Sequence, residues 1–139
     1  MKIALIVLGS LVALILLAVI GIGGLIAYQT REVSRLVTAF EAEFKPGTTT
    51  AILIDRAIEI GATSLILVPG DGLTILYDKQ FPGDGRNKPE HLEEVRESVS
   101  KTANFKLMIA VPGFLNARWL IDVETEDHKI KSISSRYID

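Results

Sequence analysis

The chain has 139 residues, which leaves room for a single domain, and it contains no cysteine, so disulfides, thiolate nucleophiles and cysteine-based zinc sites are excluded. Of its 15 Lys and Arg residues only Lys2 precedes residue 31, so the rest of the chain carries 14 basic residues against 17 acidic ones. This slightly acidic balance, without a basic run, argues against nucleic acid as a partner and offers no polybasic patch for anionic lipid.

The first element is an apolar stretch from Ile3 to Tyr28 that contains no charged residue. A helix needs about 20 apolar residues to cross about 30 Å of hydrocarbon, so we predict an integral, single-pass transmembrane anchor over residues 1–29. A cleaved signal peptide is the alternative, but its apolar region runs over only about 7–15 residues. The length of the stretch therefore favours an uncleaved signal anchor.

The charges that flank this stretch bear on its orientation. Lys2 lies before it, and Arg31, Arg35 and Lys45 follow it, so a simple count of basic residues places the following domain on the cytoplasmic side. A lysine directly before an apolar helix is also typical of signal anchors that keep their start in the cytoplasm. We expect a protein of the cell membrane with an extracytoplasmic C-terminal domain, and the cytoplasmic alternative stays open.

Small residues recur within the apolar stretch. Gly9 and Ala13 form one pair at a spacing of four, and Gly23 and Ala27 form a second pair fourteen residues later. Fourteen residues are close to four helical turns, so the two pairs fall near one helix face, where another helix can approach closely. This pattern predicts that the helix pairs with itself or with a partner's membrane helix, although ordinary filling of a membrane helix is the alternative.

Residues 30–46 are predicted to form a juxtamembrane amphipathic helix that continues the membrane helix. Its apolar residues recur at spacings of three and four, and Pro46-Gly47 ends it; these residues are Val33, Leu36, Val37, Phe40 and Phe44. The apolar stripe has two possible roles. It extends the small-residue seam beyond the membrane, or it docks onto this protein's own sheet.

Residues 47–139 are predicted to form a small α+β domain, with a mainly antiparallel sheet of about five strands packed by two or three helices. Helices are expected at 48–60, capped by the hydroxyls of Thr48–Thr50 and ended by Gly61, and at 90–102. Strands are expected at 64–68, 73–77, 105–111, 116–123 and 129–138, the first covered on both faces and the last containing a bulge. Trp119 alternates with apolar residues and is predicted to face the helices.

This domain contains two nearly identical pentapeptides. Ile66–Gly70 reads Ile-Leu-Val-Pro-Gly and Ile109–Gly113 reads Ile-Ala-Val-Pro-Gly, each after a helix and before a strand. Pro-Gly suits the two middle positions of a type II turn, so each motif predicts a hairpin. The repetition also suggests two duplicated helix–strand–turn–strand units, with chance recurrence of a common turn sequence as the alternative.

The first pentapeptide belongs to a longer stretch, Ala57–Gly70, which reads Ala-Ile-Glu-Ile-Gly-Ala-Thr-Ser-Leu-Ile-Leu-Val-Pro-Gly. It resembles a signature in the N-terminal, non-ATPase domain of type II secretion and type IV pilus ATPases, where a helix ending in Gly-Ala-Ser-Asp-Ile runs into a strand that ends near a proline. The order of elements over roughly residues 49–125 is also similar. Ser64 and Ile66 stand where that family has an aspartate and a histidine. The resemblance therefore implies a similar fold for this domain but implies no activity.

Residues that could perform catalysis are few. The sequence has no phosphate-binding loop, no His-Glu-x-x-His and no Gly-x-Ser-x-Gly motif, so we predict no catalytic, metal or cofactor-binding residue and no cofactor. His91 and Glu94 would share a helix face, which makes a metal or acid–base role conceivable. His128 lies in a predicted turn, where a solvated histidine is the ordinary case.

The longest stretch without periodicity is the loop 78–89. Its Phe81 is an apolar residue in a connecting segment, and with Asp84 and Arg86 it forms a possible interaction site, although a plain connector is the alternative. We therefore expect a membrane-anchored, non-enzymatic interaction or structural module, such as an accessory subunit of a membrane or envelope assembly. The second hypothesis is a membrane-tethered domain that binds or weakly hydrolyses a small molecule through His91 and this loop.

Overall fold

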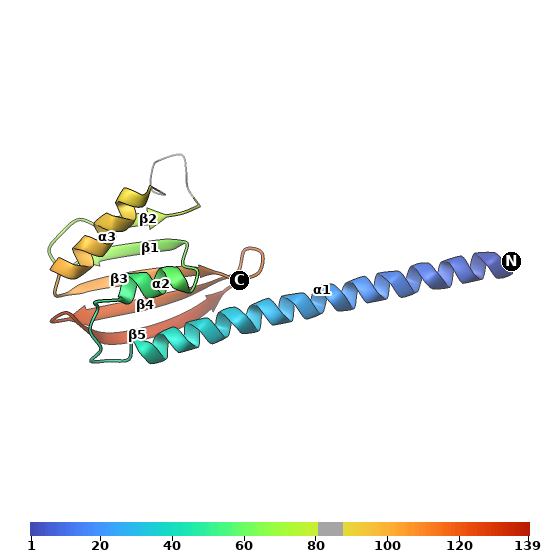
Figure 1. The fold of residues 1–139 in the computed structure, drawn as a ribbon, viewed down its shortest axis with the longest axis horizontal. Coiled ribbons are helices and arrows are strands. Elements are labelled where there is room, and N and C mark those ends of the chain that lie inside the picture. Colours follow the sequence, from blue (N-terminus) through green and yellow to red (C-terminus); the bar gives the residue numbers. More distant parts are fainter. Residues whose placement is uncertain (81–87) are drawn as a thin grey trace.

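The computed structural model describes residues 1–80 and 88–139 (Figure 1). One long helix leads into an antiparallel sheet with two further helices in the described part of the chain, so the α+β prediction is confirmed. The elements in chain order are α1 (Lys2–Glu43), α2 (Leu53–Glu59), β1 (Ser64–Pro69), β2 (Ile75–Asp78), α3 (Pro89–Lys101), β3 (Phe105–Pro112), β4 (Arg118–Glu126) and β5 (Lys129–Ile138).

Helix α1 is continuous over 42 residues, so the amphipathic segment extends the apolar one without a break. Within the helix the hydroxyls of Ser10, Thr30 and Thr38 each donate to the carbonyl four residues earlier at 2.9 Å, which satisfies them without a break in the helix. At the far end Phe40 and Phe44 are buried in the core beneath the sheet. The apolar stripe therefore packs against this protein's own sheet.

Helix α2 is shorter than the sequence pattern predicts, because it begins at Leu53 without a side-chain cap. The threonines expected to cap it pair with the start of β5 instead. Thr49 forms a β-bridge with Lys129, and the amide of Ile130 donates to the Thr48 carbonyl at 2.8 Å. At the other end Gly61 has a φ of 95°, and its amide bonds to the Ile58 carbonyl at 3.0 Å, so the glycine ends the helix as predicted.

The five strands of the described chain lie in the order β2-β1-β3-β4-β5, with every neighbouring pair antiparallel. The C-terminal third of α1 lies with α2 and α3 on one face of this sheet (Figure 1). The core lies between the two layers, and its sheet side includes Leu65, Leu67, Leu107, Ile109, Ile121 and Val123. Trp119 is half-buried on this same face, against the core, as predicted.

No helix of the described residues covers the other face of the sheet. In β1 the side chains of Leu65 and Leu67 are fully buried, whereas Val68 is 44% exposed and Ile66 is half-buried. The prediction that this strand is covered on both faces is therefore wrong. Its uninterrupted apolar run reflects one buried face and one apolar face that meets solvent.

Both Pro-Gly hairpins form, but neither uses the predicted type II turn. The φ of Gly70 and of Gly113 is not in the left-handed region. Gly70 instead donates its amide to the Asn104 carbonyl at 3.1 Å, and Gly113 donates to the Ala117 carbonyl at 2.8 Å. In the connection between β3 and β4 the left-handed residue is Leu115, with a φ of 55°.

The β4–β5 hairpin turns at Asp127 and His128, whose φ angles of 52° and 61° are those of a type I′ turn. Two hydrogen bonds to the loop before β3 hold these non-glycine residues: the Asp127 amide donates to Asn104 Oδ1 and the His128 amide donates to the Ala103 carbonyl, both at 3.0 Å. The register then shifts beside Lys131, which confirms the predicted bulge in the last strand.

Candidate functional site

Two surfaces of the molecule carry apolar side chains that the fold does not bury. The first is the N-terminal part of α1, which is strongly apolar and has no buried residue in its most apolar stretch. By length and composition this helix can cross a membrane. Because its last turns pack into the core, the helix and the domain form one continuous unit.

The four small residues of the predicted packing face all lie on this exposed part of α1. Gly9, Ala13, Gly23 and Ala27 are exposed, and a Cβ added at Gly9 or Gly23 would meet no atom within 4 Å. These positions contact no other element of the described chain. The face that they form is therefore available to a second helix.

The second surface is the uncovered face of the sheet, which we call the open face. The register aligns Ile66, Met108 and Asp122 across β1, β3 and β4, and it aligns Val68, Lys106 and Glu124 in the next row. A hollow of about 440 Å³ lies over these two rows and reaches Ser132 and Ser134 of β5. Apolar side chains of β1 and β3 thus lie beside charged and hydroxyl side chains of β4 and β5.

The charges on the open face are paired only loosely. Lys131 Nζ lies 3.7 Å from both Glu124 Oε1 and Glu126 Oε2, and Arg136 Nε lies 3.9 Å from Asp122 Oδ2. Solvent-exposed pairs of this kind contribute about 0–1 kcal/mol. They can therefore be exchanged for contacts with a partner at little cost.

A separate hollow of about 350 Å³ lies between α2, α3 and the β4–β5 turn. Arg96 of α3 lines it and donates from Nη2 to Asp55 Oδ1 at 2.7 Å, with a further ion pair to Glu93. The hydrogen bond to Asp55 raises the pKa of Arg96 above its ordinary value. This guanidinium therefore links α3 to α2, and its charge is already engaged.

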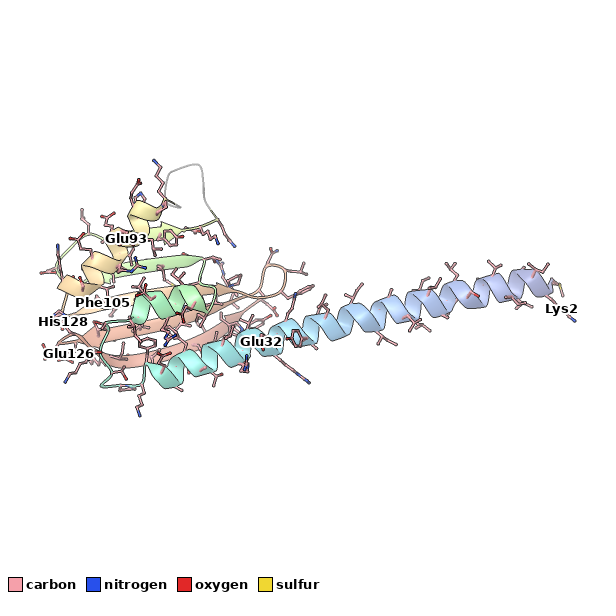
Figure 2. All side chains as sticks on the ribbon, viewed as in Figure 1. Lys2, Glu32, Glu93, Phe105, Glu126 and His128 are labelled. Carbon is pink, nitrogen blue, oxygen red and sulfur yellow. The ribbon has the colours of Figure 1, made fainter. Side chains whose placement is uncertain are left out.

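The two histidines lie apart. His91 on α3 is half-buried, with Nδ1 3.6 Å from Glu94 Oε2, whereas His128 is exposed in the turn at the far end of the sheet (Figure 2). Within residues 1–80 and 88–139, no three His, Asp or Glu side chains are grouped so as to hold a metal ion. The predicted interaction residues Phe81, Asp84 and Arg86 lie outside the described residues.

Sequence reasoning missed the open face. Its apolar residues Ile66, Val68 and Met108 alternate along β1 and β3 with the apolar residues that face the core. Such strands fit either a sheet covered on both faces or a sheet with one exposed apolar face, and the sequence pattern alone does not separate the two.

No family model, curated protein or solved structure matches the chain.

Proposed function

We propose that this chain is a single-pass protein of the cell membrane whose domain is a non-enzymatic interaction module. It holds a partner protein beside the membrane, as an accessory subunit of a membrane or envelope assembly does. The observation that carries this proposal is the continuity of α1, which is exposed and apolar over its first part and buried in the core at Phe40 and Phe44. A flexible linker would leave the domain free to tumble, whereas this helix fixes it relative to the membrane.

The open face is the proposed contact with the partner. Its hollow has apolar side chains beside loosely paired charges, which is the composition of an interface core with a polar rim. Arg96 is already engaged in ion pairs, and the two histidines lie apart from each other, so these residues give no comparable support to a hydrolytic site. A binding role through the open face therefore follows from more of the observed chemistry than the small-molecule hypothesis does.

Site-specific photocrosslinking in intact membranes tests this contact. A photoreactive amino acid at Met108, on the open face, should give a discrete adduct with one partner. The same probe at Ser100, exposed on α3, is the control and should not give that adduct. Replacing Ile66 with aspartate should abolish the Met108 adduct while the domain stays folded. Adducts of equal yield from both positions, or an adduct from Ser100 alone, would move the contact off the open face.

We place the domain on the extracytoplasmic side, as Lys2 before the apolar stretch favours. A C-terminal fusion to an enzyme that works only outside the cytoplasm should be active. A fusion to a fluorescent protein that folds only inside should be dark. The reverse pattern would put the domain in the cytoplasm, as the count of Arg31, Arg35 and Lys45 favours.

We further propose that the small-residue face of α1 pairs with a second membrane helix, from another copy of this chain or from the partner. Lipid offers no hydrophobic drive between helices, so association depends on close approach at small residues. The exposed glycines Gly9 and Gly23, with open space around each, support this proposal.

A further inference from the structure

One end of the sheet lies at the point where α1 leaves the domain. β3 ends, β4 begins and β5 ends there, whereas Glu126, His128 and the β4–β5 turn lie at the opposite end (Figures 1 and 2). From the first of these ends α1 extends toward Lys2. If α1 crosses a bilayer, the connection between β3 and β4, residues Gly113–Ala117, is directed at the surface of that bilayer.

This β3–β4 turn presents an apolar side chain to solvent. Leu115 is 84% exposed and has a φ of 55°, a conformation that is unfavourable for a bulky residue. Two hydrogen bonds fix the turn, from the Gly113 amide to the Ala117 carbonyl at 2.8 Å and from the Ala117 amide to the Phe114 carbonyl at 3.0 Å. The leucine is thus held away from the core by a closed turn.

Aromatic and basic side chains surround the same end of the sheet. The rings of Trp119 and Tyr137 lie 5.3 Å apart, and Tyr137 is 43% exposed. Tyr28, at the end of the apolar stretch of α1, is 67% exposed. Trp and Tyr concentrate where a membrane meets water, because one part of each ring system is apolar and another forms hydrogen bonds. Arg31 and Arg118 are exposed and can extend toward lipid phosphates.

The depth of the turn follows from the helix beside it. Trp119 lines a hollow with residues between Thr30 and Ala42 of α1. Trp119 follows Leu115 by four positions along the chain, so the distance between them is at most about 13 Å, at about 3.3 Å per step in extended chain. The same length corresponds to about nine helical residues. Counted from the middle of residues 30–42 toward Lys2, this upper limit places Leu115 no farther along α1 than about Tyr28, where the apolar stretch ends.

We infer that the β3–β4 turn docks onto the bilayer that α1 crosses, with Leu115 among the lipid headgroups and Tyr137 and Arg118 at the same level. This inference rests on the proposed membrane span of α1. The helix and the turn then make two contacts with one membrane, and together they hold the strands roughly perpendicular to its surface. The open face is consequently directed sideways, where a partner embedded in the same membrane can reach it.

The absence of cysteine allows single labels on the full chain. Leu115→Cys, Leu73→Cys and Ile22→Cys each receive an environment-sensitive nitrobenzoxadiazole probe. The three proteins are reconstituted into phosphatidylcholine vesicles without a nitroxide lipid, with a lipid that carries a nitroxide near its headgroup, or with a lipid that carries the nitroxide on its acyl chain. Leu73 is the matched control, since it is 90% exposed and lies after β1, at the end of the sheet away from α1's apolar part. Ile22 reports the insertion of α1.

The probe at Leu115 should shift to shorter wavelength and lose at least half of its emission to the nitroxide lipid, while the probe at Leu73 loses less than a tenth. Equal, weak quenching at Leu115 and Leu73, with strong quenching by chain-labelled nitroxide lipid at Ile22, would overturn the docked turn and leave the tether standing. Weak quenching at all three positions would overturn the tether and the docked turn together. Quenching at position 115 that is unchanged after Tyr137→Ser and Arg118→Ser would overturn the part of the inference that places Tyr137 and Arg118 at the lipid headgroups.

Discussion

The junction between α1 and the sheet can be tested by removing one aromatic ring. Phe40 is 2% exposed and its ring centroid lies 4.7 Å from that of Phe44, which is fully buried. Transfer of one phenylalanine side chain from water to the core contributes about 1.5–3 kcal/mol, and the cavity left behind adds to the loss. We expect Phe40→Ala to lower the free energy of unfolding by about 3–4 kcal/mol.

The contact between the two rings can be separated from burial by a double-mutant cycle. Tilted aromatic pairs contribute about 0.5–1.5 kcal/mol beyond their buried area. The double variant Phe40→Ala, Phe44→Ala should therefore lose less free energy than the two single variants together, by that amount. Thr38→Ala is the control on the same helix. Its side chain is exposed, so the free energy should change by less than about 0.5 kcal/mol.

Urea unfolding of the full chain in detergent micelles measures these values. The chain has one tryptophan, Trp119, which lies beside α1 and reports whether the helix is docked. With a slope of about 1–3 kcal/mol per molar urea, a loss of 3–4 kcal/mol moves the midpoint by roughly 2 M. A midpoint for Phe40→Ala within about 0.3 M of the parent, with unchanged Trp119 fluorescence, would mean that α1 does not pack on the sheet in solution. The rigid tether would then lose its basis.

Three further outcomes follow from single contacts. Thr125→Val leaves the Phe105 amide, which donates to Thr125 Oγ1 at 3.0 Å, without a partner and should cost about 1–3 kcal/mol in urea unfolding, whereas Thr125→Ser should cost less than half as much. Gly61→Ala forces a side chain into a φ of 95° and should lower the thermal midpoint by several degrees, which calorimetry measures. Replacing Gly9 and Gly23 with leucine should abolish crosslinking within the membrane and leave the urea midpoint unchanged; persistent crosslinking would leave the small-residue face without a role.

Much of the fold could be predicted from local pattern. The apolar stretch of α1, the helix that ends at Lys101, the glycine that ends α2 and the bulge in β5 are all set by residues close together in sequence. The start of α2 could not be predicted in this way, because Thr49 forms a β-bridge with Lys129, eighty residues away. A threonine that can cap a helix or pair with a strand gives the same local signal in both cases, and only the tertiary partner decides.

The repeated pentapeptide shows why the open face could not be predicted from the sequence. Alignment of Ile66–Gly70 with Ile109–Gly113 places Ile66 on Ile109, yet Ile66 lies on the open face and Ile109 is fully buried. Side chains alternate between the two faces of a strand. If the two pentapeptides were copies of one unit whose helices pack on the same face of the sheet, their matching residues would point to the same face. The phases are opposite, so the repeat reflects a common sequence at strand ends and not a duplicated structure. Ile66 and Met108, which lie on the open face and are only half-buried, are among the residues that line the hollow.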